Sequence, residues 1–173
     1  MILNLLYFLI AAFVVIVMLH FVAFLYKKNC IPVTPVIAGP TSNTYSLDNR
    51  ETVISPFETF YFNGKSVNPK KYKVCRVVSE SMGRRGIIPN DLVFIKEFKE
   101  QEDKKSMLNK GDILYIQYPK NDGEKGYKLR EFDRIDGEKI LTIHYTAKGE
   151  IEPSTGPHKL EDILGIVKMK FTY

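Results

Sequence analysis

Residues 127–145 read YKLREFDRIDGEKILTIHY, and this stretch decides the fold. Two runs rich in β-branched and aromatic residues, 127–135 and 139–145, lie on either side of Asp136-Gly137. A short Asp-Gly link between two such runs is a strong hairpin signal. The stretch therefore predicts two neighbouring antiparallel strands.

Further runs of the same composition occur on both sides of this hairpin, separated by turn residues, at 72–78, 92–98, 113–118 and 163–171. Repeated short runs of this kind predict a mainly β fold, an antiparallel barrel or sandwich domain over residues 70–173. The segment 99–110, rich in Glu, Lys and Gln, is compatible with a surface helix or an exposed loop. A chain of 173 residues has room for this domain and one membrane segment.

The N-terminal part of the chain is apolar over the length of a membrane span. Residues 5–26 read LLYFLIAAFVVIVMLHFVAFLY, with His20 as the single strongly polar side chain. At a rise of about 1.5 Å per residue, such a helix matches a hydrocarbon core of about 30 Å. No Lys or Arg precedes the run and bulky residues close it, unlike a cleaved signal peptide. The sequence predicts a retained transmembrane helix within an anchor of residues 1–28.

The residues after this run predict its orientation and a tether. Lys27 and Lys28 place the excess positive charge on the C-terminal side, which predicts a cytoplasmic β domain. A protease of exported proteins would instead work on the extracytoplasmic side. Residues 29–69 are rich in Pro, Thr, Ser, Asn and Gly, with four prolines between positions 32 and 56. This composition predicts a tether with short extended segments.

Composition also limits the classes of function. The net charge is +5, but Lys and Arg alternate with Asp and Glu over most of the chain, so no nucleic-acid partner is expected. Cys30 and Cys75 fit neither a zinc-ligand spacing nor a disulfide framework, and there is no glycine-rich phosphate loop. The expectation is a protein without cofactor or metal. Its expected partners are a protein or peptide substrate and a lipid bilayer, with the oligomeric state left open.

One serine and one lysine suggest a chemistry for the β domain. Ser81 follows the predicted strand at 72–78, at a place where a side chain can project into a cleft. Lys128 lies on a later predicted strand, where burial would disfavour its ammonium form and let the neutral amine take the Ser81 proton. The backbone N–H of Ser81 and the hydroxyl of Ser79 are candidate oxyanion donors. A Ser/His/Asp triad using His144 or His158 has no recognisable pattern to support it.

The order of several segments resembles a known superfamily. Residues 77–82 (VVSESM) and 86–93 (GIIPNDLV) resemble the nucleophile region shared by type I signal peptidases and LexA-type self-cleaving repressors. Similar segments follow in order at 110–119 (KGDILYIQYP), 136–140 (DGEKI) and 160–167 (LEDILGIV). The resemblance covers about residues 70–173. It implies coiled antiparallel β-sheets, Ser81 as nucleophile, Lys128 as general base and Met82 in substrate binding.

Three interpretations remain open at this point. The chain could be a membrane-anchored serine endopeptidase that cuts other chains, or a non-catalytic, membrane-tethered interaction module of the same fold. It could also be an anchored regulator that releases its own β domain, because Ala38-Gly39 resembles the bond that LexA-type proteins cut in themselves. Lys125 is the reserve candidate for the base, because in this chain Leu129 separates Lys128 from the arginine that usually follows the catalytic lysine directly. Arg130 is excluded as a base because its guanidinium stays charged.

Overall fold

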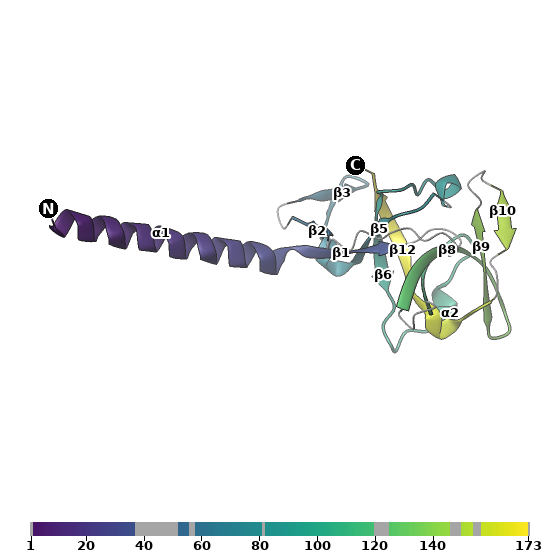
Figure 1. Cartoon of the computed structure of the whole chain (residues 1–173). Coiled ribbons are helices and arrows are strands. Elements are labelled where there is room, and N and C mark those ends of the chain that lie inside the picture. The colour runs from purple at the N-terminus through teal and green to yellow at the C-terminus, as the bar shows by residue number, and fades with distance from the viewer. Residues whose placement is uncertain are drawn as a thin grey trace.

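The computed structural model describes residues 2–36, 52–55, 58–80, 82–119, 125–145, 150–153 and 157–172. Helix α1 (Ile2–Asn29) extends away from the rest of the chain as a single rod (Figure 1). It contains the whole of the apolar run at 5–26, so the prediction of a helix there is confirmed. Where its side chains are described, large apolar residues such as Phe13 and Phe21 are exposed. Within the residues that the structure describes, no helix reaches the length and apolarity that crossing a membrane requires.

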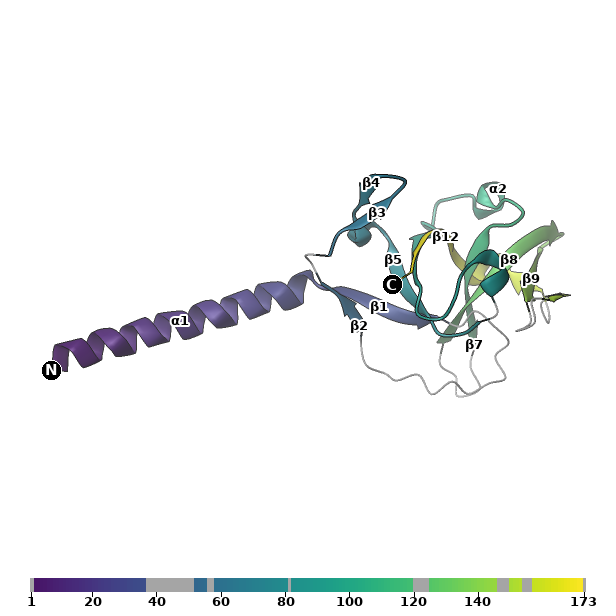
Figure 2. The ribbon, with the colours of Figure 1, turned by 90° about the horizontal axis from the view of Figure 1, so that it is seen from above.

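The remainder of the described chain is mainly β (Figures 1 and 2). One large sheet has the strand order β10-β9-β8-β7-β12-β6-β5-β1-β2, with β11 paired to β9, and a separate hairpin joins β3 to β4. The strands are β1 (Ile31–Val36), β2 (Thr52–Ile54), β3 (Phe60–Phe62), β4 (Lys65–Val67), β5 (Lys73–Val77), β6 (Leu92–Glu97), β7 (Ile113–Pro119), β8 (Lys125–Asp136), β9 (Lys139–Tyr145), β10 (Ile151–Pro153), β11 (His158–Lys159) and β12 (Ile163–Phe171). The short helices are η1 (Pro69–Lys71), η2 (Gly83–Arg85), α2 (Lys104–Met107) and η3 (Leu160–Asp162).

The hairpin at 127–145 forms as the sequence indicates. β8 and β9 pair antiparallel up to Asp136 and Lys139, and the turn between them places Gly137 at φ +59°. That left-handed backbone conformation is one that glycine adopts without steric cost. The strands predicted at 72–78, 92–98, 113–118 and 163–171 are also confirmed, within one residue at each end. The Glu- and Lys-rich segment 99–110 contains only the four-residue helix α2.

Two expectations need correction at the N-terminal side of the sheet. The sheet is mixed rather than antiparallel throughout, because β1 and β5 pair in parallel, with Val33 opposite Val74 and Val36 opposite Val77. Sheet pairing therefore begins at Ile31, well before the boundary at residue 70 that composition suggested. β1 joins the sheet because its apolar residues Ile31, Val33 and Val36 are buried, while Pro32 and Pro35 remain exposed.

The two faces of the large sheet carry different apolar clusters. One cluster contains Cys75, Val77, Met82, Tyr115 and Leu129, among others. A second, on the opposite face of β7, is formed by Leu114, Ile116, Phe132, Ile140, Ile163 and Ile166. A third gathers Ile31, Val33, Ile54, Phe60, Val74, Leu92, Phe94 and Met169 near the start of β1. The sheet is thus covered on both faces, and this separation of faces determines where the candidate site residues lie.

We expect Gly165→Ala to destabilise the domain. Gly165 lies in β12 between β6 and β7, and a Cβ there would come within 2.6 Å of the Lys96 carbonyl oxygen, which is backbone and cannot move aside. Overpacking of this kind costs about 1–3 kcal/mol. Urea unfolding of the full chain in detergent, followed by circular dichroism, measures the loss. Gly83→Ala is the matched control, because a Cβ at that position has nothing within 4 Å, and an equal loss in both variants would contradict the packing argument.

Candidate active site

The segment that leads to Ser81 continues along β1 after β5 has ended. The Val78 N–H donates a hydrogen bond to the Val36 carbonyl at 3.1 Å, so the chain still follows β1 at this point. Ser79, the predicted oxyanion donor, is buried with 3% of its surface exposed. Ser81 itself lies outside the described residues, as do Ala38 and Gly39. The site is therefore described from the residues that surround these three positions.

A tight turn fixes the chain on both sides of Ser81. The Gly83 N–H donates to the Glu80 carbonyl at 2.9 Å, and the N–H groups of Arg85 and Ile87 both donate to the Met82 carbonyl. The Met82 side chain has no exposed surface and packs in the cluster that contains Tyr115 and Leu129. Met82 therefore secures this turn to one face of the sheet. Because its side chain is fully buried, only the Met82 backbone is left to contact a substrate.

Glu131 of β8 holds the turn after Ser81 through a network of polar contacts. The Arg85 Nε atom lies 3.2 Å from a Glu131 carboxylate oxygen, and the Tyr145 hydroxyl donates to the same carboxylate. A second Arg85 nitrogen donates to the Gly111 carbonyl at 2.9 Å, and the Arg84 guanidinium lies over the Tyr145 ring. This network joins the turn after Ser81 to β8 and β9. It involves residues to which the sequence gave no role.

Lys128, the predicted base, lies on β8 opposite Ile116 of β7 and is partly buried. Its Nζ atom lies 5.2 Å from the centroid of the Tyr118 ring, which covers Gly126 so closely that no Cβ fits there. Burial and, to a smaller extent, the nearby Arg130 guanidinium together lower the pKa of Lys128 from 10.5 to about 8, while Asp162 acts in the opposite direction. A substantial fraction of this amine is neutral near pH 8, as a general base requires.

Other basic groups gather around Lys128. Arg130 is 3% exposed, and burial lowers its pKa to about 10. Burial, with Lys128 and Arg130 adding to the effect, lowers the pKa of His158 to about 4. Burial and Arg130 also lower the pKa of His144, although its Nε2 atom lies 3.1 Å from a Glu152 carboxylate oxygen. Both imidazoles are therefore neutral at neutral pH, close to two cationic side chains.

The sheet places Lys128 and Met82 on opposite faces. Side chains alternate between the faces of a strand, and Tyr127 and Leu129 of β8 both pack with the cluster that contains Met82. Lys128, between them, projects to the other face, with Tyr118 and Arg130. We call these two faces of β8 the Met82 face and the Lys128 face. The spacing of Ser81 and Lys128 in the sequence gave no indication of this separation.

Lys125, the reserve candidate, has the opposite placement. It lies two residues before Tyr127 on β8, so strand alternation assigns it to the Met82 face. It is exposed, at the end of β8 where Pro119 is its partner on β7. A general base needs a lowered pKa and a position near the nucleophile, and neither lysine is shown to have both. Lys128 has the desolvated amine, and Lys125 lies on the face that carries Met82.

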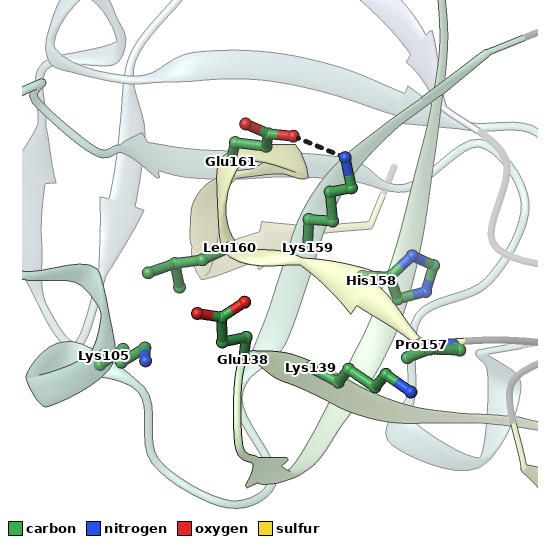
Figure 3. A pocket seen from close by; sticks show the side chains of 8 residues that line it. All are labelled: Lys105, Glu138, Lys139, Pro157, His158, Lys159, Leu160 and Glu161. Carbon is green, nitrogen blue, oxygen red and sulfur yellow. Dashed lines mark hydrogen bonds and ion pairs between the residues drawn. The ribbon is translucent and has the colours of Figure 1, made fainter.

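A cavity of about 670 Å³ lies elsewhere, away from Lys128, Met82 and Lys125. Figure 3 shows its lining, which comes from α2, the β8–β9 turn, β9, β11 and η3: Lys105, Glu138, Lys139, Pro157, His158, Lys159, Leu160 and Glu161. None of the predicted site residues lines it. Only His158 connects this cavity with the basic groups around Lys128.

Comparison with known proteins assigns no family. No protein-family model matches the chain, and no curated protein sequence matches it either. Among the residues that the structure describes, no group of three or more His, Cys, Asp or Glu side chains is placed to hold a metal ion. Interpretation of the site therefore depends on its own geometry and charges.

The alternation of side chains along the strands could have predicted part of this arrangement from the sequence. Alternation along β8 and β9 predicts that Lys128, Arg130 and Phe132 share one face, with Glu131 on the other. It does not predict that Arg85 reaches Glu131, because the two residues lie far apart in the sequence and meet only in the folded chain.

We expect Lys128→Met to raise stability most below pH 8. The pKa of Lys128 is lower in the folded chain than in the unfolded chain, so folding releases protons from this group between about pH 8 and 10.5. The cost of keeping a charged amine there is full below pH 8 and disappears as the pH rises to 10.5. The stability difference between Lys128→Met and the parent, from urea unfolding at a series of pH values, should decrease across that window. Lys125→Met, on the same strand, is the control, and a pH-independent difference for Lys128→Met would contradict the argument.

Proposed function

We propose that this chain is a membrane-anchored serine endopeptidase with a Ser/Lys dyad. Ser81 is the nucleophile, Lys128 the general base, and the buried Ser79 assists the oxyanion. The observation that carries the proposal is the partly buried Lys128 amine, whose pKa is lowered to about 8 by burial and by Arg130. The fold of LexA-type peptidases and signal peptidases is part of this proposal, supported by the order of strands along residues 70–173.

The proposed reaction proceeds in two steps. The neutral Lys128 Nζ takes the proton of the Ser81 hydroxyl while Oγ attacks the substrate carbonyl carbon. The peptide C–N bond then breaks, and the ammonium of Lys128 returns the proton to the leaving amine. In the second step the amine takes a proton from water while the water oxygen attacks the acyl carbon. The ester C–O bond then breaks, and the ammonium of Lys128 returns the proton to Ser81 Oγ. The reaction consumes only the peptide and one water molecule, and it regenerates both side chains.

The anchor in this proposal is α1. This helix contains the apolar run at 5–26, the sequence feature that predicts an anchor. Large apolar side chains are exposed along it, including Phe13 at 68%, Met18 at 61% and Phe21 at 57%. A helix that is apolar on all sides belongs in a nonpolar environment. Lys27 and Lys28 support a cytoplasmic position for the β domain.

The parallel pairing of β1 and β5 favours the chain itself as one substrate. Val36 and Val77 are partners, so both strands end at the same edge of the sheet. In the sequence, Ala38 follows Val36 by two residues and Ser81 follows Val77 by four, so both positions come shortly after strands that end at that edge. Cleavage between Ala38 and Gly39 would separate the anchor and β1 from the remaining domain.

A second candidate function is a non-catalytic interaction module tethered by α1. The observation that favours it is the placement of Lys128 and Met82 on opposite faces of β8, because the turn after Ser81 is held on the Met82 face. On that face the residues of β8 next to Met82 are apolar or aromatic, Tyr127 and Leu129. The carboxylate that β8 carries on that face, Glu131, is held by Arg85 and Tyr145.

Substitution of the two candidate lysines tests these functions. We expect Lys128→Met to lower cleavage by roughly 10²–10⁴-fold, the usual contribution of a general base, and Lys125→Met to leave it unchanged. The measurement is mass spectrometry of fragments from the full chain in membranes, alone and with a panel of preproteins, with Ser81→Ala as the inactive reference. The rate should rise as the pH passes about 8, because the amine must be neutral.

Each outcome selects one interpretation. A new terminus at Gly39 in the parent, absent in Ser81→Ala, supports self-cleavage, and cut preproteins support action on other chains. Loss of activity in Lys125→Met with activity retained in Lys128→Met would transfer the base to the Met82 face. No difference between the parent and Ser81→Ala in any fragment would leave the interaction module.

A further inference from the structure

The β3–β4 hairpin lies at the end of the β domain nearest α1. The Cys30 N–H donates to the Tyr26 carbonyl at 3.1 Å, continuing the helix, and β1 begins at the next residue. Phe60, the first residue of the hairpin, is buried in the same cluster as Ile31, the first residue of β1. Both ribbon views show the hairpin on the α1 side of the domain (Figures 1 and 2). A bilayer that contains α1 would therefore have its surface close to this hairpin.

The hairpin presents aromatic side chains to its surroundings. Tyr61 is 65% exposed and Phe62 is 40% exposed, whereas among the described residues of the β domain the other exposed large apolar side chains, Ile88 and Ile151, are isolated. Phe60 secures the hairpin through edge-to-face contacts with Phe94 and Phe171, at centroid distances of 5.1 and 5.0 Å. The aromatic pair is thus held outward from a fixed base and is not part of the domain core.

Basic residues are frequent in and directly after this hairpin. Residues 58–73 contain four lysines and one glutamate, a net charge of +3. Lys65 is the strand partner of Phe62, and Lys70 and Lys71 follow in the short helix η1. All three lysines are exposed. Exposed aromatic side chains close to lysines suit the headgroup region of a bilayer. Amphipathic aromatic side chains are enriched there, and anionic lipids attract Lys and Arg.

We propose that Tyr61, Phe62, Lys65, Lys70 and Lys71 form a second membrane contact that rests on the headgroup surface of an anionic bilayer. We call this set the hairpin surface. The proposal rests on the membrane anchor of the proposed function, since α1 brings the surface to the bilayer. Because one residue separates α1 from β1, the anchor and the hairpin surface together would hold the β domain in a defined orientation, so that the turn carrying Ser81 has a fixed position relative to the bilayer.

Tryptophan probes test this contact directly, because the chain contains no tryptophan. The full chain is reconstituted in vesicles of phosphatidylcholine and phosphatidylglycerol that carry brominated acyl chains, which quench nearby tryptophan. Separate variants carry Tyr61→Trp in the hairpin surface, Val15→Trp in α1 and Ile151→Trp on β10. We expect quenching and blue-shifted emission for Val15→Trp and Tyr61→Trp, and neither for Ile151→Trp, because Ile151 is exposed and belongs to β10, which lies at the end of the domain away from α1 in Figure 1.

Charge reversal tests the lipid chemistry. Adding Lys70→Glu and Lys71→Glu to Tyr61→Trp should reduce the equilibrium constant of hairpin docking by at least roughly fivefold per lysine, lowering the quenching, and phosphatidylcholine alone should do the same. Lys105→Glu with Lys139→Glu, two exposed lysines beside the cavity of Figure 3, is the matched control and should leave the quenching unchanged.

The outcomes separate the two proposals. Quenching of Val15→Trp without quenching of Tyr61→Trp overturns the membrane contact of the hairpin surface and leaves the anchor intact. Absence of quenching for Val15→Trp overturns the anchor, and the hairpin contact with it. Equal quenching of Tyr61→Trp and Ile151→Trp would show a domain without fixed orientation and would also overturn the proposal.

Discussion

The parallel pairing of β1 with β5 is the constraint on which the arrangement of this chain depends. β1 follows α1 after a single residue, and its partner β5 leads directly toward Ser81. The pairing therefore connects the apolar helix, the central sheet and the candidate nucleophile within one short stretch of structure. The same pairing buries Ile31 beside Phe60, which fixes the β3–β4 hairpin at the end of the domain next to the helix.

Much of the fold could be predicted from residue types, and the exceptions have a physical reason. The strands rich in β-branched and aromatic residues, β5 to β9 and β12, follow from composition and from the Asp136-Gly137 turn. β1 does not, because its two prolines remove backbone donors and read locally as a tether. Its place in the sheet comes from burial of Ile31, Val33 and Val36 against distant residues, a tertiary effect that local propensity does not contain. The parallel direction of that pairing is likewise set by the three-dimensional path of the chain.

The candidate site was predictable to a lesser degree. The sequence indicated that Lys128 would lie on a strand with apolar neighbours, and the lowered pKa agrees with that reasoning. Which face it occupies depends on strand register, and a shift of one residue reverses the face of every side chain. The contacts of Arg85 and Tyr145 with Glu131 bring together three separate segments, so no local pattern reveals them. Sequence reasoning therefore identified the titratable group and missed what surrounds it.

The charges around Lys128 bear on why the amine is perturbed. Lys128 and Arg130 lie on one face of β8 with His144 and His158 nearby, and each cation lowers the pKa of its neighbours. Such a cluster opposes folding, because desolvation and like-charge repulsion both disfavour it, and Asp162 offsets only part of the effect at Lys128. A region where charge placement works against stability is where function is most often found, since it departs from what packing alone would select. The cluster therefore makes the Lys128 face a candidate functional surface independently of Ser81.

The lowered pKa of Lys128 is a property of the Lys128 face, whereas the turn after Ser81 is fixed by Met82 and Glu131 on the Met82 face.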